Sequence, residues 1–210
     1  MRFTKTRVDD RRINEVAVKA SEVVLPWDDV APLYFTQWLE KFSKAHGTTK
    51  ELMFMSILPA VSSLLGQLSK LQMTSTYREN LGLFTLGICS PSGGKNQCFS
   101  FGCKQPISFV EMKSRTCLLL DKFIEVGLRQ HLLQNSGVGL LMNEEMEDTL
   151  RHIHSERECG TLCRLFDGDS LYINTGSSNS RQKIERSSLA IGGFMQVSYG
   201  PLPFITTPLL

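Results

Sequence analysis

The segment that most constrains the fold is Cys-Ser-Pro-Ser-Gly-Gly-Lys-Asn, at positions 89–96. It follows an apolar run at 81–88 and precedes a stretch that can form a helix, at 95–104. A strand, a glycine-bearing turn, a lysine and a helix, in that order, can bind phosphate, because backbone N–H groups and the lysine face the anion. The sequence therefore predicts that phosphate binds at Ser90, Pro91, Ser92, Gly93, Gly94, Lys95 and Asn96.

The loop departs from the usual pattern, G-x-x-x-x-G-K-[ST], at two positions. Gly94 and Lys95 match the pattern, whereas Cys89 stands at the first glycine position and Asn96 at the Ser/Thr position. The Ser/Thr hydroxyl ordinarily ligates Mg²⁺ in such loops. We therefore expect a phosphate site whose metal chemistry is weakened.

The rest of the chain alternates between short apolar runs and helical segments, which predicts an α/β fold with a mostly parallel sheet flanked by helices. Ligands in such sheets bind at the carboxyl ends of the strands. The expected strands are at 71–74, 81–88, 116–120, 138–142, 171–173 and 189–197, and the expected helices of this part are at 95–104, 123–134 and 147–155.

Two helices are predicted before the first strand, at 33–45 and from 50 to about 68. The second is apolar all round, which indicates a buried helix, and Thr48 or Thr49 can cap it. The domain organisation expected from these segments is an N-terminal arm at 1–31, a helical buttress at 32–70 and a P-loop NTPase-like core at 71–210.

A second motif lies at the carboxyl end of a predicted strand, where Asn143 and Glu144 follow the run at 139–142. An NTPase needs a Mg²⁺ ligand and a carboxylate that orients the attacking water at this edge. Glu144 is the candidate for the carboxylate, and Asn143 takes the place of the usual aspartate. Glu145 could supply the missing charge if the register shifts by one, and the alternative for both glutamates is a solvated first helical turn.

Both expected metal positions, Asn96 and Asn143, thus carry amides, and an amide oxygen lacks the charge of a carboxylate. We expect a phosphate-bearing nucleotide to bind here with a weak or degenerate Mg²⁺ site. Arg181 and Arg186, in a basic cluster with Lys183, could neutralise transition-state charge, and Gln196 could contact the γ-phosphate or the water. The alternatives, an exposed charged loop and an ordinary polar strand end, stay open.

Composition sets broad limits on these expectations. The chain of 210 residues is 41% apolar and 21% charged, which is typical of globular proteins, and its net charge of +2 is too small to predict nucleic-acid binding. It shows no signal peptide and no apolar stretch long enough to span a bilayer, so we expect an intracellular protein with reduced cysteines and no membrane partner. Cys98, Cys103 and Cys117 are expected in the core.

Several short segments, in order, resemble the domain-of-unknown-function family three-nine-eight-seven, a P-loop NTPase-like family similar to helicase- or primase-associated ATPases of phages and mobile elements. The matching segments are 62–66, 90–95, 140–145, 165–168, Arg181 and 189–193. The resemblance implies ATP binding and a DNA-replication or mobile-element setting with nucleic acid nearby. The family domain continues past the strand at 189–197, so we expect the C-terminal part of the domain to be missing, which would leave an open sheet edge.

The sequence therefore predicts a P-loop domain that binds ATP and can hydrolyse its β–γ bond, with Lys95 stabilising phosphate charge and Glu144 positioning water. Two rivals remain. One is a catalytically weak nucleotide-binding or scaffold domain, which the paired amides favour. The other is a structural interaction module in which the turn binds nothing.

Overall fold

The computed structural model describes residues 23–66, 68–122, 124–153, 156–174 and 181–196. The chain divides into two compact units, and the larger comprises Leu39–Val197. The described part of the smaller unit holds α2 (Trp27–Val30) and the first residues of α3 (Leu33–His46). In α3 the ring of Phe35 stacks on that of Trp38, with 5.8 Å between the ring centroids. The helix predicted at 33–45 is confirmed. None of the described helices is long and apolar enough to cross a membrane.

The second predicted helix is α4 (Lys50–Leu65), and Thr49 caps it by accepting a hydrogen bond from the Leu52 N–H. Its composition predicted a helix buried on all sides, and this prediction is wrong. Val61, Leu64 and Leu65 are each more than two-fifths exposed. Its buried side is made largely of small residues, which let the helix backbone lie close to the sheet.

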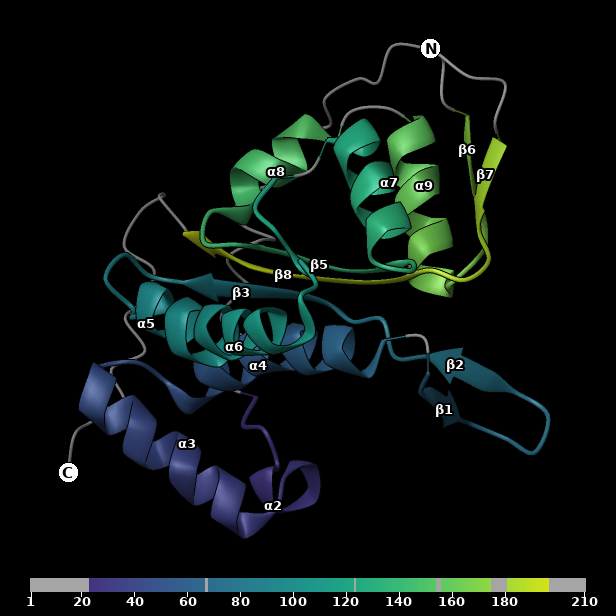
Figure 1. The fold of residues 1–210 in the computed structure, drawn as a ribbon. Helices are drawn as coiled ribbons and strands as arrows, with labels where there is room; N and C mark the ends of the chain where they lie inside the picture. The colour runs from purple at the N-terminus through teal and green to yellow at the C-terminus, as the bar shows by residue number, and fades with distance from the viewer. Residues whose placement is uncertain (1–22, 67, 123, 154–155, 175–180, 197–210) are drawn as a thin grey trace, which may run out of the picture. The chain divides into compact units, whose positions relative to one another are not determined.

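The centre of the larger unit is a four-stranded parallel sheet in the order β3-β8-β5-β4. Helices α4 to α6 cover one face and α7 to α9 cover the other (Figure 1). The predicted α/β class with a parallel, helix-flanked sheet is confirmed. The strands are β3 (Phe84–Cys89), β4 (Leu119–Leu120), β5 (Val138–Asn143) and β8 (Ser188–Gln196), and the helices are α5 (Lys95–Phe99), α6 (Gln105–Ser114), α7 (Glu125–Gln134), α8 (Met146–His152) and α9 (Glu156–Asp167).

Strand β8 lies between β3 and β5 and is covered on both faces. A Cβ at Gly192 would lie 2.5 Å from Pro59 of α4, and a Cβ at Gly193 would lie 2.5 Å from Met146 of α8. The two glycines therefore let helices on opposite faces approach the same strand. The β5 residues between the terminal two are all buried, as expected for a parallel strand with helices on both sides.

The core on the α7–α9 face is a cluster of aliphatic side chains that joins two helices to the sheet and to a hairpin. The hairpin consists of β6 (Leu171–Asn174) and β7 (Arg181–Ile184), which pair antiparallel. The buried members of the cluster are Leu128, Leu132, Leu141, Leu165, Leu171, Ile184 and Leu189.

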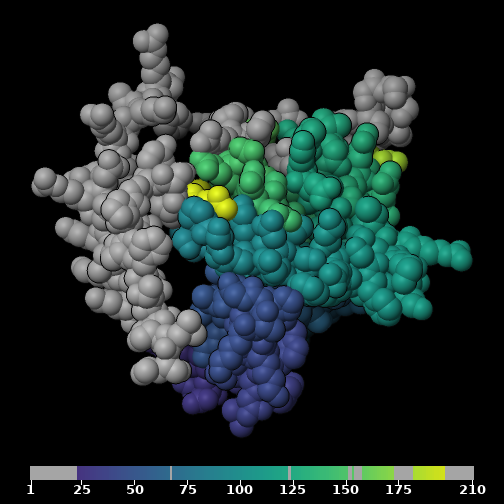
Figure 2. All heavy atoms as spheres, turned by 90° about the vertical axis from the view of Figure 1, so that its left-hand side faces the viewer, coloured from purple at the N-terminus to yellow at the C-terminus, as the bar shows by residue number. Residues whose placement is uncertain are grey.

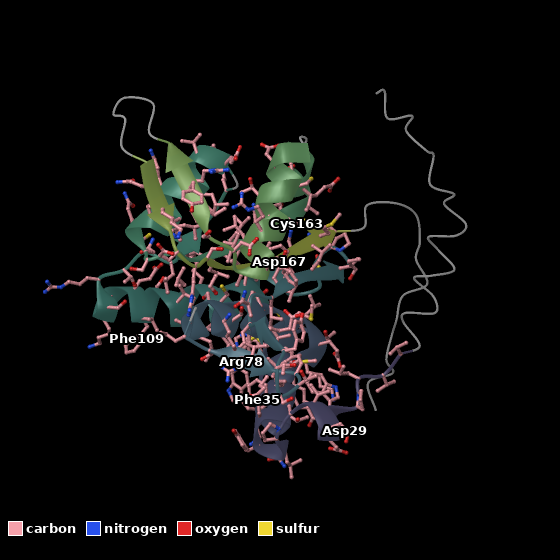
Figure 3. The ribbon with its side chains drawn as sticks, turned by 90° about the vertical axis from the view of Figure 1, so that its right-hand side faces the viewer. Asp29, Phe35, Arg78, Phe109, Cys163 and Asp167 are labelled. Atoms are coloured by element: carbon pink, nitrogen blue, oxygen red, sulfur yellow. The ribbon has the colours of Figure 1, made fainter. Side chains whose placement is uncertain are left out.

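Before the sheet, the chain forms an exposed antiparallel hairpin that the sequence predicted only in part. The strand expected at 71–74 corresponds to β1 (Lys70–Gln72), whereas β2 (Arg78–Asn80) lies outside the predicted strands. The two strands are short and mostly exposed. The Asn80 side-chain amide donates to the carbonyl of Asp167 at the end of α9. In Figure 3, the labels Arg78 and Asp167 mark β2 and the end of α9.

The helical run after the loop does not end at 104, which corrects the end of the helix predicted at 95–104. A π-helical turn, Ser100–Lys104, follows α5 and continues directly into α6. Pro106 stands in the first turn of α6, where a helix tolerates a residue without an N–H group. Phe109, beyond the helix predicted at 95–104, lies in α6 and is exposed (Figure 3).

The two edges of the described sheet differ from the expected strands. The run at 116–120 was expected to form a strand buried on both faces, but β4 has only two residues, both half-buried. At the other edge, Phe84, Leu86 and Ile88 of β3 present apolar side chains that are 39%, 38% and 65% exposed. Among the described strands, β3 thus forms an open, apolar edge of the sheet.

His131 makes the stability of the larger unit depend on pH. Burial lowers the pKa of His131, against a smaller opposing effect of its hydrogen bond with the Leu118 carbonyl, which is 3.1 Å from Nε2. The unfolded chain therefore binds more protons than the folded chain as the pH falls through about 6.5, and stability is lost there. We expect His131→Gln to reduce the loss in unfolding free energy between pH 8 and pH 5.5, measured by urea denaturation. An unchanged loss would contradict this assignment.

Candidate functional site

The predicted phosphate loop has the local structure that its sequence indicates, a strand followed by a tight turn and a helix. β3 ends at Cys89, the Gly93 N–H donates to the Ser90 carbonyl at 3.1 Å, and α5 begins at Lys95. Ser92 and Gly94 have φ angles of 65° and 80°, in the left-handed region. The turn therefore brings the start of α5 to the carboxyl edge of the sheet.

Lys95 joins the two sequence motifs. Its Nζ donates to the backbone carbonyl of Glu144 at 3.3 Å and lies 3.7 Å from the Glu145 carboxylate. The Lys95 side chain is 12% exposed, whereas that of Glu145 is 71% exposed. The loop after β3 and the acidic pair after β5 thus meet through one ammonium group. Glu144 contributes its backbone and Glu145 its carboxylate to this contact.

Asn143 is held by hydrogen bonds at both ends of its amide. The Nδ2 group donates to the Asp121 carbonyl at 3.3 Å and to the Thr149 hydroxyl at 3.1 Å. Oδ1 accepts the Glu145 N–H at 2.9 Å, which forms a turn at the end of β5. Asn143 therefore ties β5 to the end of β4 and to α8, a structural task that its sequence position did not indicate. Asn96 is exposed in the first turn of α5.

We expect Asn143→Asp to destabilise the protein by about 1–3 kcal/mol, because aspartate cannot donate to the Asp121 carbonyl or the Thr149 hydroxyl. The turn to the Glu145 N–H needs only an oxygen and is retained. Urea denaturation measures the effect, and Asn96→Thr, at an exposed position, is the control with a change within about 0.5 kcal/mol. Equal stability of Asn143→Asp and the unaltered chain would contradict these hydrogen-bond assignments.

Gln196 is the last residue of β8 and therefore lies at the carboxyl end of the sheet, as the phosphate loop does. It pairs in register with Cys89, the last residue of β3, while Asn143 pairs with Gly193 three positions earlier. Figure 2 looks onto this edge, where the end of β8, in yellow, lies between the blue-green surface near the loop and the green surface of α8. The strand order therefore places Gln196 between the two motifs, where it was expected to act.

The basic cluster of Arg181, Lys183 and Arg186 lies near the amino end of β8, at the end of the sheet opposite the phosphate loop. Arg186 precedes the first residue of β8, and Arg181 begins β7, whose hairpin stands at the amino end of that strand (Figure 1). Gln196 lies ten positions after Arg186, a length of about 30 Å in extended strand. Arg186 therefore does not reach the phosphate loop of its own chain, which corrects the expected role. Nearby, Lys183 pairs with the Glu185 carboxylate at 2.7 Å.

A cavity of about 610 Å³ opens beside the contact between Lys95 and the acidic pair. Its lining includes Phe99 and Met142 together with the carboxylates of Asp121, Glu144 and Asp148. Its size lies within the usual range for small-molecule sites. It extends toward the β4 and α8 side of Lys95, and none of residues 90–96 is among those that line it.

Metal and cysteine chemistry receive little support in the described part of the chain. No group of three or more His, Cys, Asp or Glu side chains there could hold a metal ion. Cys98 and Cys103 are buried, as expected, and burial raises the pKa of the Cys103 thiol to about 12, which keeps it protonated and inert. Cys117, expected in the core, is exposed.

No model of a known protein family matches this chain, and no curated protein matches it.

One contributor to the site was not expected from the sequence. The Thr48 hydroxyl lies 3.2 Å from the Gly93 carbonyl, although 45 positions separate the two residues. The sequence predicts for Thr48 only a role as helix cap, and Thr49 is the residue that caps α4. A contact between segments so far apart has no local sequence signal.

Proposed function

We propose that this chain is a P-loop NTPase-like domain that binds a nucleoside triphosphate, ATP, at residues 90–96. The observation that carries the proposal is the position of Lys95. It begins the helix after the β3 turn and reaches the acidic pair at the end of β5. A buttressed lysine at the carboxyl edge of a parallel sheet is suited to an anionic ligand.

The physical basis of phosphate binding is a set of positive groups at one point. The N–H groups at the start of α5 carry partial positive charge, and Lys95 adds a full charge. The continuous helical run from α5 through the π-helical turn to α6 holds that start in place. A bound phosphate would compete with the Glu145 carboxylate for the Lys95 ammonium group.

Hydrolysis is the second part of the proposal. Glu144 would position the attacking water, Gln196 would contact the γ-phosphate or that water, and Lys95 would stabilise the developing charge. Mg²⁺, when bound, neutralises phosphate charge. The available side chains fit this ion poorly, because Asn96 and Asn143 offer neutral amides and Asn143 is engaged in hydrogen bonds. This observation favours a nucleotide-binding domain with weak turnover as the second candidate.

Binding of a fluorescent ATP analogue, followed by anisotropy and competed with unlabelled ATP, tests the proposal. We expect saturable binding that pyrophosphate also displaces, because the loop recognises phosphate rather than the base. Omitting Mg²⁺ should weaken the affinity by less than about tenfold, since no carboxylate stands at either expected ligand position. Absence of saturable binding would contradict the nucleotide site.

We further propose, on the family resemblance alone, that the domain works in a nucleic-acid setting. The basic residues Lys183 and Arg186 are candidates for phosphate-backbone contacts because they lie away from the nucleotide loop. Binding to a DNA duplex should weaken as salt rises, and neutralising both residues should reduce the salt dependence by about two phosphate contacts. Binding that is unaffected by salt and by the double variant would contradict this setting.

A further inference from the structure

The turn of the phosphate loop is held from behind by the segment that joins α3 to α4. We infer that Thr48 is the positioning residue of the loop. Its hydroxyl would fix the orientation of the peptide group between Gly93 and Gly94 and so set the affinity for phosphate. The inference rests on the proposed function because its ligand is the phosphate of that function. The hydrogen bond between Thr48 and the Gly93 carbonyl is independent of any ligand.

Thr48 takes part in a short chain of hydrogen bonds that ends on the loop. Its Oγ1 donates to the Gly93 carbonyl at 3.2 Å and lies 3.1 Å from the Cys98 sulfur. Because the single hydroxyl proton is used on Gly93, the Cys98 thiol is the donor in the second contact. Thr48 thus connects the turn to the first turns of the helix that follows it.

The hydrogen bond on the Gly93 carbonyl decides where the next N–H group points. In a trans peptide the C=O and N–H bonds point in opposite directions. With the carbonyl directed at Thr48, the Gly94 N–H points away from Thr48. Backbone N–H groups of such a turn are the groups that bind phosphate. Thr48 therefore orients a phosphate-binding donor without touching the ligand.

The close approach of Thr48 also explains why position 94 is glycine. A Cβ at Gly94 would lie 2.7 Å from the Thr48 Cβ and 3.0 Å from its hydroxyl oxygen. Its φ of +80° also disfavours any other residue. The loop and Thr48 are complementary in shape at this point, which limits movement of the turn toward Thr48.

Helix α4, which follows Thr48, is hydrogen-bonded to the elements on both sides of the loop. These bonds hold Thr48 in position. The Ser56 hydroxyl of α4 lies 2.9 Å from the Cys98 carbonyl, in the helix that follows the loop, and shares its one proton between that carbonyl and the Met53 carbonyl at 2.8 Å. The Thr85 hydroxyl of β3 donates to the Met55 carbonyl of α4 at 3.4 Å. Helix α4 is thus hydrogen-bonded to the strand before the loop and to the helix after it, and Thr48 is hydrogen-bonded to the loop itself.

The test compares adjacent threonines that have different tasks. Thr48→Val removes the hydroxyl and keeps the shape, Thr48→Ser restores the hydroxyl, and Thr49→Val removes the cap of α4 without touching the loop. We expect Thr48→Val to lower the affinity for the ATP analogue by about three- to tenfold, which is the usual effect of losing one hydrogen bond. Thr48→Ser should bind within about twofold of the unaltered chain. Thr49→Val should lower the urea midpoint and leave the affinity unchanged.

Amide hydrogen exchange of the peptide that covers 90–98 provides a readout that needs no nucleotide. Thr48→Val should speed exchange there, and Thr49→Val should not. If Thr48→Val does not fold, Thr48→Ala is measured in its place. Affinity and loop exchange that are the same in Thr48→Val and Thr49→Val would overturn the inference. A chain that binds no analogue but shows the exchange difference would overturn the proposed function and retain the buttress.

Discussion

Replacing Glu144 by glutamine is expected to lower the rate of ATP hydrolysis by about 10²–10⁴-fold, the usual contribution of a positioned general base. Glutamine keeps the size of the side chain and leaves the backbone carbonyl that accepts from Lys95. Affinity for ATP should therefore change little. Turnover is measured as released phosphate under saturating ATP, and affinity is measured separately with the fluorescent analogue.

Glu145→Gln is the matched control for this prediction, since the neighbouring carboxylate pairs with Lys95 and is largely exposed. We expect this variant to hydrolyse ATP at close to the original rate. Because it removes a competitor for the Lys95 ammonium group, it should bind the analogue slightly more tightly. The reverse result, with Glu145→Gln inactive and Glu144→Gln active, would shift the catalytic register by one residue. Absence of turnover in the unaltered chain would favour the weak nucleotide-binding domain.

Replacing Lys95 by methionine is expected to weaken ATP binding by about 10- to 150-fold. The range corresponds to a charge-assisted hydrogen bond of about 1.5–3 kcal/mol. Methionine keeps much of the length of the mostly buried side chain and removes the charge that serves the phosphate. The variant also loses the contacts with Glu144 and Glu145, so its folding is checked by urea denaturation before affinity is compared.

Lys113→Met, on the last turn of α6, is the charge-matched control. It removes one positive charge outside the loop and should leave affinity within about twofold. If Lys95→Met and Lys113→Met bind equally well, the ammonium group of Lys95 has no part in nucleotide binding. Weaker binding of Lys95→Met that disappears at high salt would show only a diffuse charge effect.

The parallel sheet could be read from the sequence because its strands are buried and its turns carry glycine. The run at 138–142 is continuous in apolar residues, which is typical of a strand with helices on both faces, and it forms β5. The short β4 was overestimated, because an edge strand and a buried strand can share the same apolar run. The helix after the loop was underestimated at Pro106, since a proline can begin a new helical turn as well as end one.

The site was predictable in its parts and not in their connections. Glycine, lysine and the acidic pair have local patterns, and parallel strands bring their carboxyl ends to one edge. Whether Arg186 lies at that edge depends on the direction in which β8 runs, and the structure places it at the other edge. Asn143 is bonded to β4 and α8 through residues that no spacing rule connects to it.

The sequence by itself determined the class of fold and the candidate loop, because periodicity, turn residues and helix starts are local properties of the chain. Only the tertiary structure decided that β8 lies between β3 and β5, that Lys95 reaches Glu144 and Glu145, and that Thr48 holds the Gly93 carbonyl. These contacts join segments from about 45 to more than 100 positions apart. Such pairings depend on how the buried faces of helices and strands fit together, and that fit is a property of the whole core.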